Sequence, residues 1–204
     1  MNTKTLRQIE EMKKQTIGVE VEMNNITRNK AAKIAAEFFG TGRFENTADR
    51  NGYCTWSAYD EQGREWKFQK DVSIAGIDSE KCEMVTPILN YSDIETLQEL
   101  VRILRKAGAK SDSTRGCGVH IHIGAKGHTA KTLRNLANIM ASHEQLLIDA
   151  LNLDEVRVRR YCRTVDIRFL EQVNRRKPKT MSELADVWYK SHDENYGRSH
   201  HYNG

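Results

Sequence analysis

The chain has 204 residues, with 32 Lys and Arg against 28 Asp and Glu, and its formal net charge is +4 at pH 7. This length fits one compact domain or two small ones, and the 13 Gly and 2 Pro exclude collagen-like and low-complexity classes. No apolar run approaches the ~20 residues that a membrane-spanning helix needs, so we expect no membrane partner, and so mild a positive charge argues against a nucleic-acid partner.

The N-terminal 15 residues are polar and carry Glu10 and Glu11, where a secretion signal would need an apolar run. Four cysteines lie far apart without a Cys-x-x-Cys pair, which is typical of reduced thiols: Cys54, Cys82, Cys117 and Cys162. We therefore expect a cytoplasmic protein without a disulfide.

The first half of the chain begins with a strand pattern. Residues 17–23 alternate apolar and polar side chains, which predicts a strand that buries one face and presents Glu20 and Glu22 on the other. A helix ended by Gly40 and three further strands follow, predicted at residues 29–39, 53–59, 64–70 and within 81–89. The strands at residues 53–59 and 64–70 flank a turn cluster and are predicted to form a hairpin.

The second half begins with a helix signal. Ser92 and Glu95 form a capping-box pattern that predicts a helix over residues 93–107. Residues 118–124 then alternate as strictly as the first strand, with His120 and His122 opposite an apolar face. Further helices are predicted at residues 129–151, at the start of 154–168 and from 180 to 189. Antiparallel-looking strands with helices between them indicate an α+β fold.

The two alternating strands carry side chains that can bind a metal. If they share a sheet, Glu20 and Glu22 face His120 and His122, and residues two apart in a strand project about 7 Å apart on one face. Glu83 lies in an apolar strand, where an acid needs a partner or a cation. These residues could instead be ordinary solvent-facing side chains of an antiparallel sheet, but Glu is disfavoured in strands. Together they predict a divalent-metal site.

The chemistry of these side chains indicates the metal. Carboxylates outnumber imidazoles, which favours Mg²⁺ or Mn²⁺ over Zn²⁺, and Mg²⁺ sites usually bind substrate phosphates as well. The sequence contains neither a P-loop nor a Gly-x-Gly-x-x-Gly motif. Arginines suit bidentate phosphate contacts, and the candidates are Arg115, which leads into the His strand, and Arg157, Arg159, Arg160, Arg163 and Arg198.

Five segments, in this order and spacing, resemble the putative amidoligase family, which is related to glutamine synthetase and γ-glutamylcysteine ligase. They are residues 18–22, Trp66 with 71–74, 83–89, 116–124 and 160–163. The resemblance covers about residues 17–204. It implies a single amidoligase-like domain over residues 1–204 with the α+β fold of the glutamine synthetase catalytic domain, a curved and mainly antiparallel sheet with helices packed on its outer face.

The resemblance implies an ATP-dependent carboxylate–amine ligase that joins amino-acid- or peptide-like substrates through an acyl phosphate, with ATP and Mg²⁺ (or Mn²⁺) as cofactors. The residues that it implies as metal ligands are Glu20, Glu22, Glu83 and His120. Those implied in catalysis are Glu22, Asp71, Arg160 and Arg163, and those implied in nucleotide binding are Arg115, Gly116, Gly118, His122 and Arg198.

Two other functions fit the same residues. A zinc-dependent hydrolase would hold its metal with His120 and His122 and use Glu83 or Glu22 as the base. A catalytically inactive domain of this fold would bind an amino-acid-like or peptide ligand.

The resemblance also indicates that the chain is C-terminally truncated. Members of the superfamily complete the site with a later strand that carries Glu-x-Arg, and the family segment before that strand resembles residues 197–204. We therefore expect a truncated chain, or a site that another subunit completes, and an unpaired sheet edge beside the Glu20 strand or the His120 strand.

Overall fold

The computed structural model describes residues 2–160 and 162–190. It divides into two compact units, Met1–Gly124 and Ala125–Gly204, which are described separately. The single domain expected from the sequence stays a prediction. Arg198 and the tail that begins at residue 191 lie outside the described residues.

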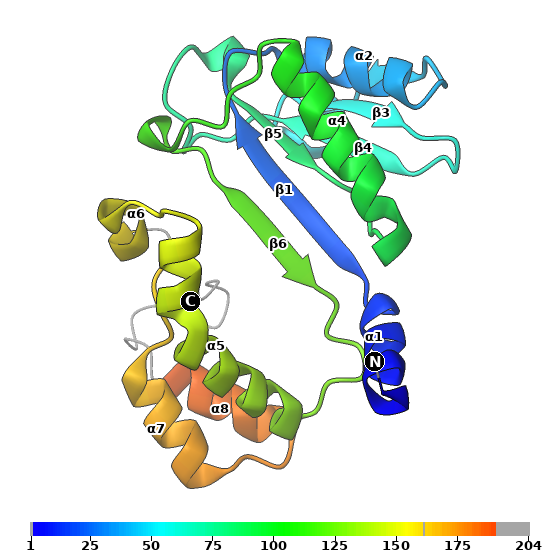
Figure 1. Ribbon diagram of the computed structural model, residues 1–204. Helices are drawn as coiled ribbons and strands as arrows, with labels where there is room; N and C mark the ends of the chain where they lie inside the picture. Colours follow the sequence, from blue (N-terminus) through cyan, green and yellow to red (C-terminus); the bar gives the residue numbers. More distant parts are fainter. Residues whose placement is uncertain (1, 161, 191–204) are drawn as a thin grey trace. The chain divides into compact units, whose positions relative to one another are not determined.

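Unit 1 contains a six-stranded sheet in the order β2-β3-β4-β5-β1-β6 (Figure 1). All neighbouring strands pair antiparallel. The strands are β1 (Ile17–Met23), β2 (Phe44–Asn46), β3 (Trp56–Tyr59), β4 (Glu65–Gln69), β5 (Cys82–Val85) and β6 (Val119–Ile123). This arrangement confirms the α+β class and the predicted hairpin. Among the described residues, β6 lies at an edge of the sheet beside β1, as expected.

The predicted helices of unit 1 are α2 (Arg28–Phe38) and α4 (Ile94–Lys106), and they pack on one face of the sheet (Figure 1). The helix α2 turns a row of fully buried alanines toward the sheet, and their small side chains allow a close approach to Trp66 and Phe68. Val19, Val21 and Met23 of β1 complete this core, so the apolar side of the alternating pattern is buried as predicted.

The capping box predicted for α4 is wrong in its position. The structure has the box at Asn90 and Asp93, where a short 3₁₀ helix (Tyr91–Asp93) precedes α4. The Asn90 N–H donates to Asp93 Oδ2 at 2.8 Å, and both oxygens of Asp93 also accept from Arg64, at 2.9 and 3.1 Å. The extra turn moves the cap two residues upstream of Ser92.

Sequence patterns did not predict α1 (Thr3–Lys13), α3 (Ala48–Asn51) or the 3₁₀ helices Asp78–Glu80 and Ser113–Arg115. The helix α1 buries no residue, and the recurrence of Leu6, Ile9 and Met12 three residues apart in its polar sequence was not recognised as a helix pattern. Asn2 caps it by accepting from the Thr5 N–H at 2.8 Å.

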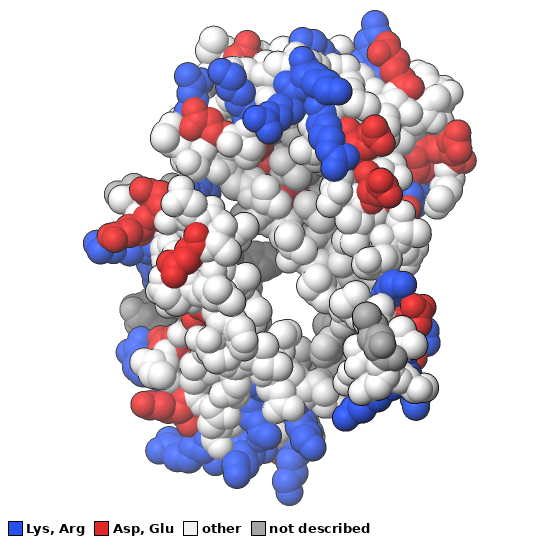
Figure 2. Space-filling view, in the orientation of Figure 1, with Lys and Arg blue, Asp and Glu red and all other residues white. Residues whose placement is uncertain are grey.

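Lys and Arg side chains lie over α4 in Figure 2, interspersed with acidic ones on the visible surface of unit 1.

Unit 2 is helical, with α5 (Ala130–Ala150), α6 (Glu155–Arg160), α7 (Ile167–Arg176) and α8 (Met181–Lys190). Its core joins Phe169 and Val173 of α7 to Leu184 and Val187 of α8. The helix α7 was not predicted, although Phe169, Leu170 and Val173 lie at helical spacing in its sequence. None of the described helices in either unit combines the length and the apolar character needed to cross a membrane.

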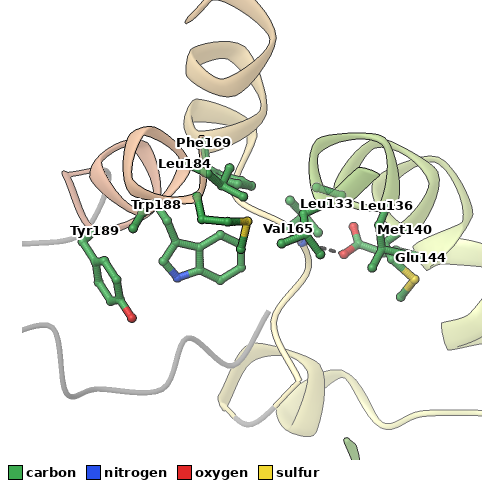
Figure 3. A pocket seen from close by; sticks show the side chains of 12 residues that line it. Leu133, Leu136, Met140, Glu144, Val165, Phe169, Leu184, Trp188 and Tyr189 are labelled. Carbon is green, nitrogen blue, oxygen red and sulfur yellow. Dashed lines mark hydrogen bonds between the residues drawn. The ribbon is translucent and has the colours of Figure 1, made fainter. Parts of the chain in front are cut away.

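An apolar pocket of about 420 Å³ opens between α5, α7 and α8 (Figure 3). Trp188 and Phe169 form part of its wall, with ring centroids 4.8 Å apart in an edge-on arrangement. Glu144 is an acidic side chain in this lining, and its Oε1 accepts the Val165 N–H at 2.6 Å.

Candidate active site

The register of the central strands gathers the predicted metal-binding side chains of unit 1. β1 lies between β5 and β6 (Figure 1). In this register Glu22 stands opposite Glu83, and Glu20 stands opposite His120. Directly opposed residues of an antiparallel pair project from the same face. The four side chains therefore share one sheet face, the one turned away from the α2 and α4 core.

One cluster on this face consists of Glu22, Asp71 and Glu83. Each offers a carboxylate oxygen, and these oxygens lie within 4.8 Å of one another. Glu22 and Glu83 are only 5% and 7% exposed, whereas Asp71 is half-buried. Asp71, which the resemblance implies as a catalytic residue, is thus brought into an acidic cluster with two of the implied metal ligands.

Uncharged donors hold one oxygen of each carboxylate in this acidic cluster. The Gly118 N–H donates to Glu22 Oε2 at 2.6 Å, and the Ser73 N–H donates to Asp71 Oδ1 at 2.6 Å. The Gln69 Nε2 donates to Glu83 Oε2 at 2.8 Å. These bonds orient the carboxylates without neutralising their charge.

Burial raises the pKa of Glu83 above its ordinary value. The hydrogen bond from Gln69 opposes this rise, and the negative charges of Glu20, Asp71 and Glu22 add to it. Buried and mutually repelling carboxylates are stabilised by a divalent cation, and an all-oxygen set suits Mg²⁺ or Mn²⁺. The residues of the acidic cluster therefore fit the predicted cation.

A second cluster on the same face joins Glu20 to both histidines of β6. His120 Nδ1 lies 3.0 Å from Glu20 Oε2, and His122 Nε2 lies 3.4 Å from Glu20 Oε1. The imidazoles are 56% and 62% exposed, so this cluster is far more accessible than the acidic one. It is a mixed nitrogen and oxygen set, which also suits transition metals such as Zn²⁺.

A close approach of two loops places Asp71 beside the sheet. The Ala75 N–H donates to the Arg115 carbonyl at 2.8 Å. Gly116 has a φ of +86°, and a Cβ there would lie 2.8 Å from the Ser73 carbonyl oxygen. Only glycine fits this position without displacing the loop. The Arg115 guanidinium is half exposed, and its Nε lies 3.8 Å from Asp112 Oδ2.

A family model described as "Putative amidoligase enzyme" matches residues 13–204. The chain belongs to this amidoligase family. No curated protein and no solved structure shows significant similarity to this chain. The match confirms the family that the ordered motifs indicated, and it supports a ligase.

The two arginines predicted to act in catalysis lie in unit 2. Arg163 is exposed in unit 2, where its Nε donates to the Arg159 carbonyl at 3.1 Å, and Arg160 is the last residue of α6. Arg198 lies outside the described residues. The roles proposed for these arginines, and the nucleotide-binding roles of Arg115, Gly116, Gly118 and His122, stay predictions.

The sequence did not indicate Gln69 as a residue of this candidate site. Its strand was predicted, but nothing in its local pattern shows that it stands opposite Glu83. The available signal was its position on the polar side of an alternating strand two residues before Asp71.

Proposed function

We propose that this amidoligase is an ATP-dependent carboxylate–amine ligase with a glutamine-synthetase-like catalytic domain. A substrate carboxylate attacks the γ-phosphate of ATP and forms an acyl phosphate, with ADP as the leaving group. An amine then attacks the acyl carbon, phosphate leaves and an amide is formed. The substrates are amino-acid-like or peptide-like, and the chain acts in the cytoplasm.

The observation that carries this proposal is the acidic cluster of Glu22, Asp71 and Glu83 beside Glu20 and the two histidines on one sheet face. Bound Mg²⁺ or Mn²⁺ would neutralise the triphosphate and the charge that develops during phosphoryl transfer. The acidic cluster supplies buried, oriented carboxylates that would hold such a cation. His120 and His122 lie at the accessible rim, where they can contact the cation or a phosphate oxygen.

The test is an assay of the purified chain with Mg²⁺ and ATP against pools of amino acids and short peptides. We expect ADP and phosphate to appear only when both a carboxylate and an amine substrate are present. When the amine is omitted, hydroxylamine should trap the acyl phosphate as a hydroxamate. Glu83→Gln serves as the inactive control. Amide formation without ATP consumption, or equal activity of Glu83→Gln, would contradict the proposal.

A zinc-dependent hydrolase is the second candidate, because Glu20 with His120 and His122 forms a His₂Glu set of the kind that holds catalytic zinc. Metal analysis of the purified chain separates the two functions, since the hydrolase requires stoichiometric zinc.

A melting-temperature scan separates both enzymes from an inactive binding domain, because a ligand that binds only the folded state raises that temperature. ATP with Mg²⁺ should stabilise the ligase, and zinc should stabilise the hydrolase. An inactive domain should respond only to an amino-acid or peptide ligand.

A further inference from the structure

Gln69 belongs to a row of polar side chains that crosses three strands of the sheet. It stands opposite Glu83 in the β4–β5 pair, and Glu83 stands opposite Glu22 in the β5–β1 pair. Neighbouring strands lie ~4.8 Å apart, and directly opposed side chains project from one face. Gln69 therefore forms the end of a row whose other two members belong to the acidic cluster.

The contact between Gln69 and Glu83 is a direct hydrogen bond. The amide Nε2 lies 2.8 Å from Glu83 Oε2, and the Glu83 residue is only 7% exposed. With one oxygen held by the amide, the carboxylate keeps a single orientation, in which one of its oxygens lies within 4.8 Å of oxygens of Glu22 and Asp71. The amide thus fixes the orientation of Glu83 in the acidic cluster.

The charge of the donor matters as much as its position. Two other donors to the acidic cluster within the described residues are the backbone N–H groups of Gly118 and Ser73. Gln69 is the one side chain among these three donors, and like them it is uncharged. A Lys at this position would place an ammonium beside the carboxylates and would compete with a metal ion.

We propose that Gln69 is a positioning residue that holds Glu83 for a divalent cation and, because it is neutral, leaves the negative charge of the acidic cluster available to that cation. This inference rests on the proposed function only in requiring that the acidic cluster binds a cation. Hydrogen-bond partners of metal ligands typically contribute ~10–100-fold to metal affinity.

The experiment measures Mn²⁺ affinity of the whole chain from the electron paramagnetic resonance signal of free Mn²⁺, without nucleotide or substrate. Gln69→Met removes the donor at similar length, and we expect Mn²⁺ to bind ~10–100-fold more weakly. Gln69→Lys should weaken binding further, while its metal-free melting temperature rises because the ammonium relieves repulsion between the carboxylates.

Lys67→Met is the matched control. Lys67 lies two residues earlier on the same strand and face, and its Nζ pairs loosely with Glu65 at 3.9 Å. It is not among the donors to the acidic cluster, so its substitution should leave Mn²⁺ affinity unchanged.

The outcomes separate the two proposals. If the unaltered chain binds Mn²⁺ and both Gln69 variants bind it as tightly as Lys67→Met does, the inference about Gln69 is wrong while the proposed cation site stands. A lowered melting temperature in Gln69→Met with unchanged Mn²⁺ affinity would show a merely structural role and would also overturn it. If the unaltered chain binds no Mn²⁺, the proposed cation site itself fails, and the inference fails with it. If Gln69→Met does not fold, the Mn²⁺ affinity of Gln69→Lys, compared with that of Lys67→Met, tests the inference about Gln69.

Discussion

Glu22 and Glu83 stand directly opposite each other on neighbouring antiparallel strands, and both are almost fully buried. Like charges in this position normally destabilise a sheet. Asp71 brings a third carboxylate within 4.8 Å, and uncharged donors hold all three. The three carboxylates therefore lower the stability of the metal-free sheet and concentrate negative charge on this face, an arrangement that suits a divalent cation.

Glu83→Gln should stabilise the metal-free protein at neutral pH. The pKa of Glu83 is raised by burial, so the folded state binds the proton more tightly than the unfolded state does. The unaltered chain therefore loses stability as pH rises from below about 4.5 through the raised pKa. We expect Glu83→Gln to raise the free energy of unfolding at pH 7 by on the order of 1 kcal/mol, which raises the melting temperature by a few degrees. This difference from the unaltered chain should disappear near pH 4.

Calorimetric scans across this pH range with EDTA measure the effect. Glu99→Gln on the exposed side of α4 is the control and should change little. In the ligase assay Glu83→Gln should be inactive although it is folded. A variant that melts lower at pH 7 would show that Glu83 stabilises the fold, against this interpretation.

Asp60→Asn should destabilise unit 1 at neutral pH. Burial opposes ionisation of Asp60, but hydrogen bonds from the Trp66 indole and from Arg64 outweigh it and lower its pKa. The stability from this group is therefore present above its unfolded pKa and is lost as pH falls through the lower folded value. We expect a loss of ~1–3 kcal/mol at pH 7, typical of a buried acceptor bonded to a charged group, that shrinks below about pH 4.

Urea unfolding at several pH values measures this loss. Glu61→Gln lies next to Asp60 in the same hairpin turn and is exposed, so it provides the control. A loss that is equal at pH 3 and pH 7 would argue that packing, not charge, is responsible.

Gly116→Ala should damage both stability and metal binding. A left-handed backbone costs an L residue ~1–2 kcal/mol, and here the added Cβ also meets the Ser73 carbonyl oxygen at 2.8 Å. Relief of that contact displaces the loop that carries Asp71, so Mn²⁺ affinity should fall together with the melting temperature.

Gly63→Ala separates the two effects of Gly116→Ala. Gly63 also has a positive φ, +75°, but a Cβ there has nothing within 4 Å. It should lower the melting temperature and leave Mn²⁺ affinity unchanged. Equal Mn²⁺ affinity in the Gly116 variant would show that Asp71 does not depend on this loop contact.

Glu20→Gln should weaken one class of bound cation only. Glu20 contacts both His120 and His122, whereas the acidic cluster draws its ligands from Glu22, Asp71 and Glu83. In an equilibrium-dialysis experiment with Zn²⁺ and Mn²⁺, we expect the variant to retain manganese binding and to lose whatever zinc the unaltered chain binds. Simultaneous loss of both metals would indicate a single shared site.

Local sequence patterns determined the polar face of the site. Alternation in residues 17–23 and 118–124 assigned Glu20, Glu22, His120 and His122 to the side of each strand opposite its apolar residues, and the register confirms that these side chains share a face. The period of two is a property of each strand's own residues, which is why it could be predicted without a partner strand. The helices α1 and α7 were not predicted, although apolar residues recur at helical spacing in both.

Only the tertiary structure decided how the side chains group. Asp71 joins Glu22 and Glu83 because Gly116 allows two distant loops to touch, and His122 joins Glu20 because β6 pairs with β1 at one register. Gln69 reaches Glu83 for the same kind of reason. Register and loop contact depend on segments far apart along the chain, and a shift of one residue would turn every side chain of a strand to the other face. The sequence by itself thus determined which residues bear the chemistry, and the packing of distant segments decided which of them act together.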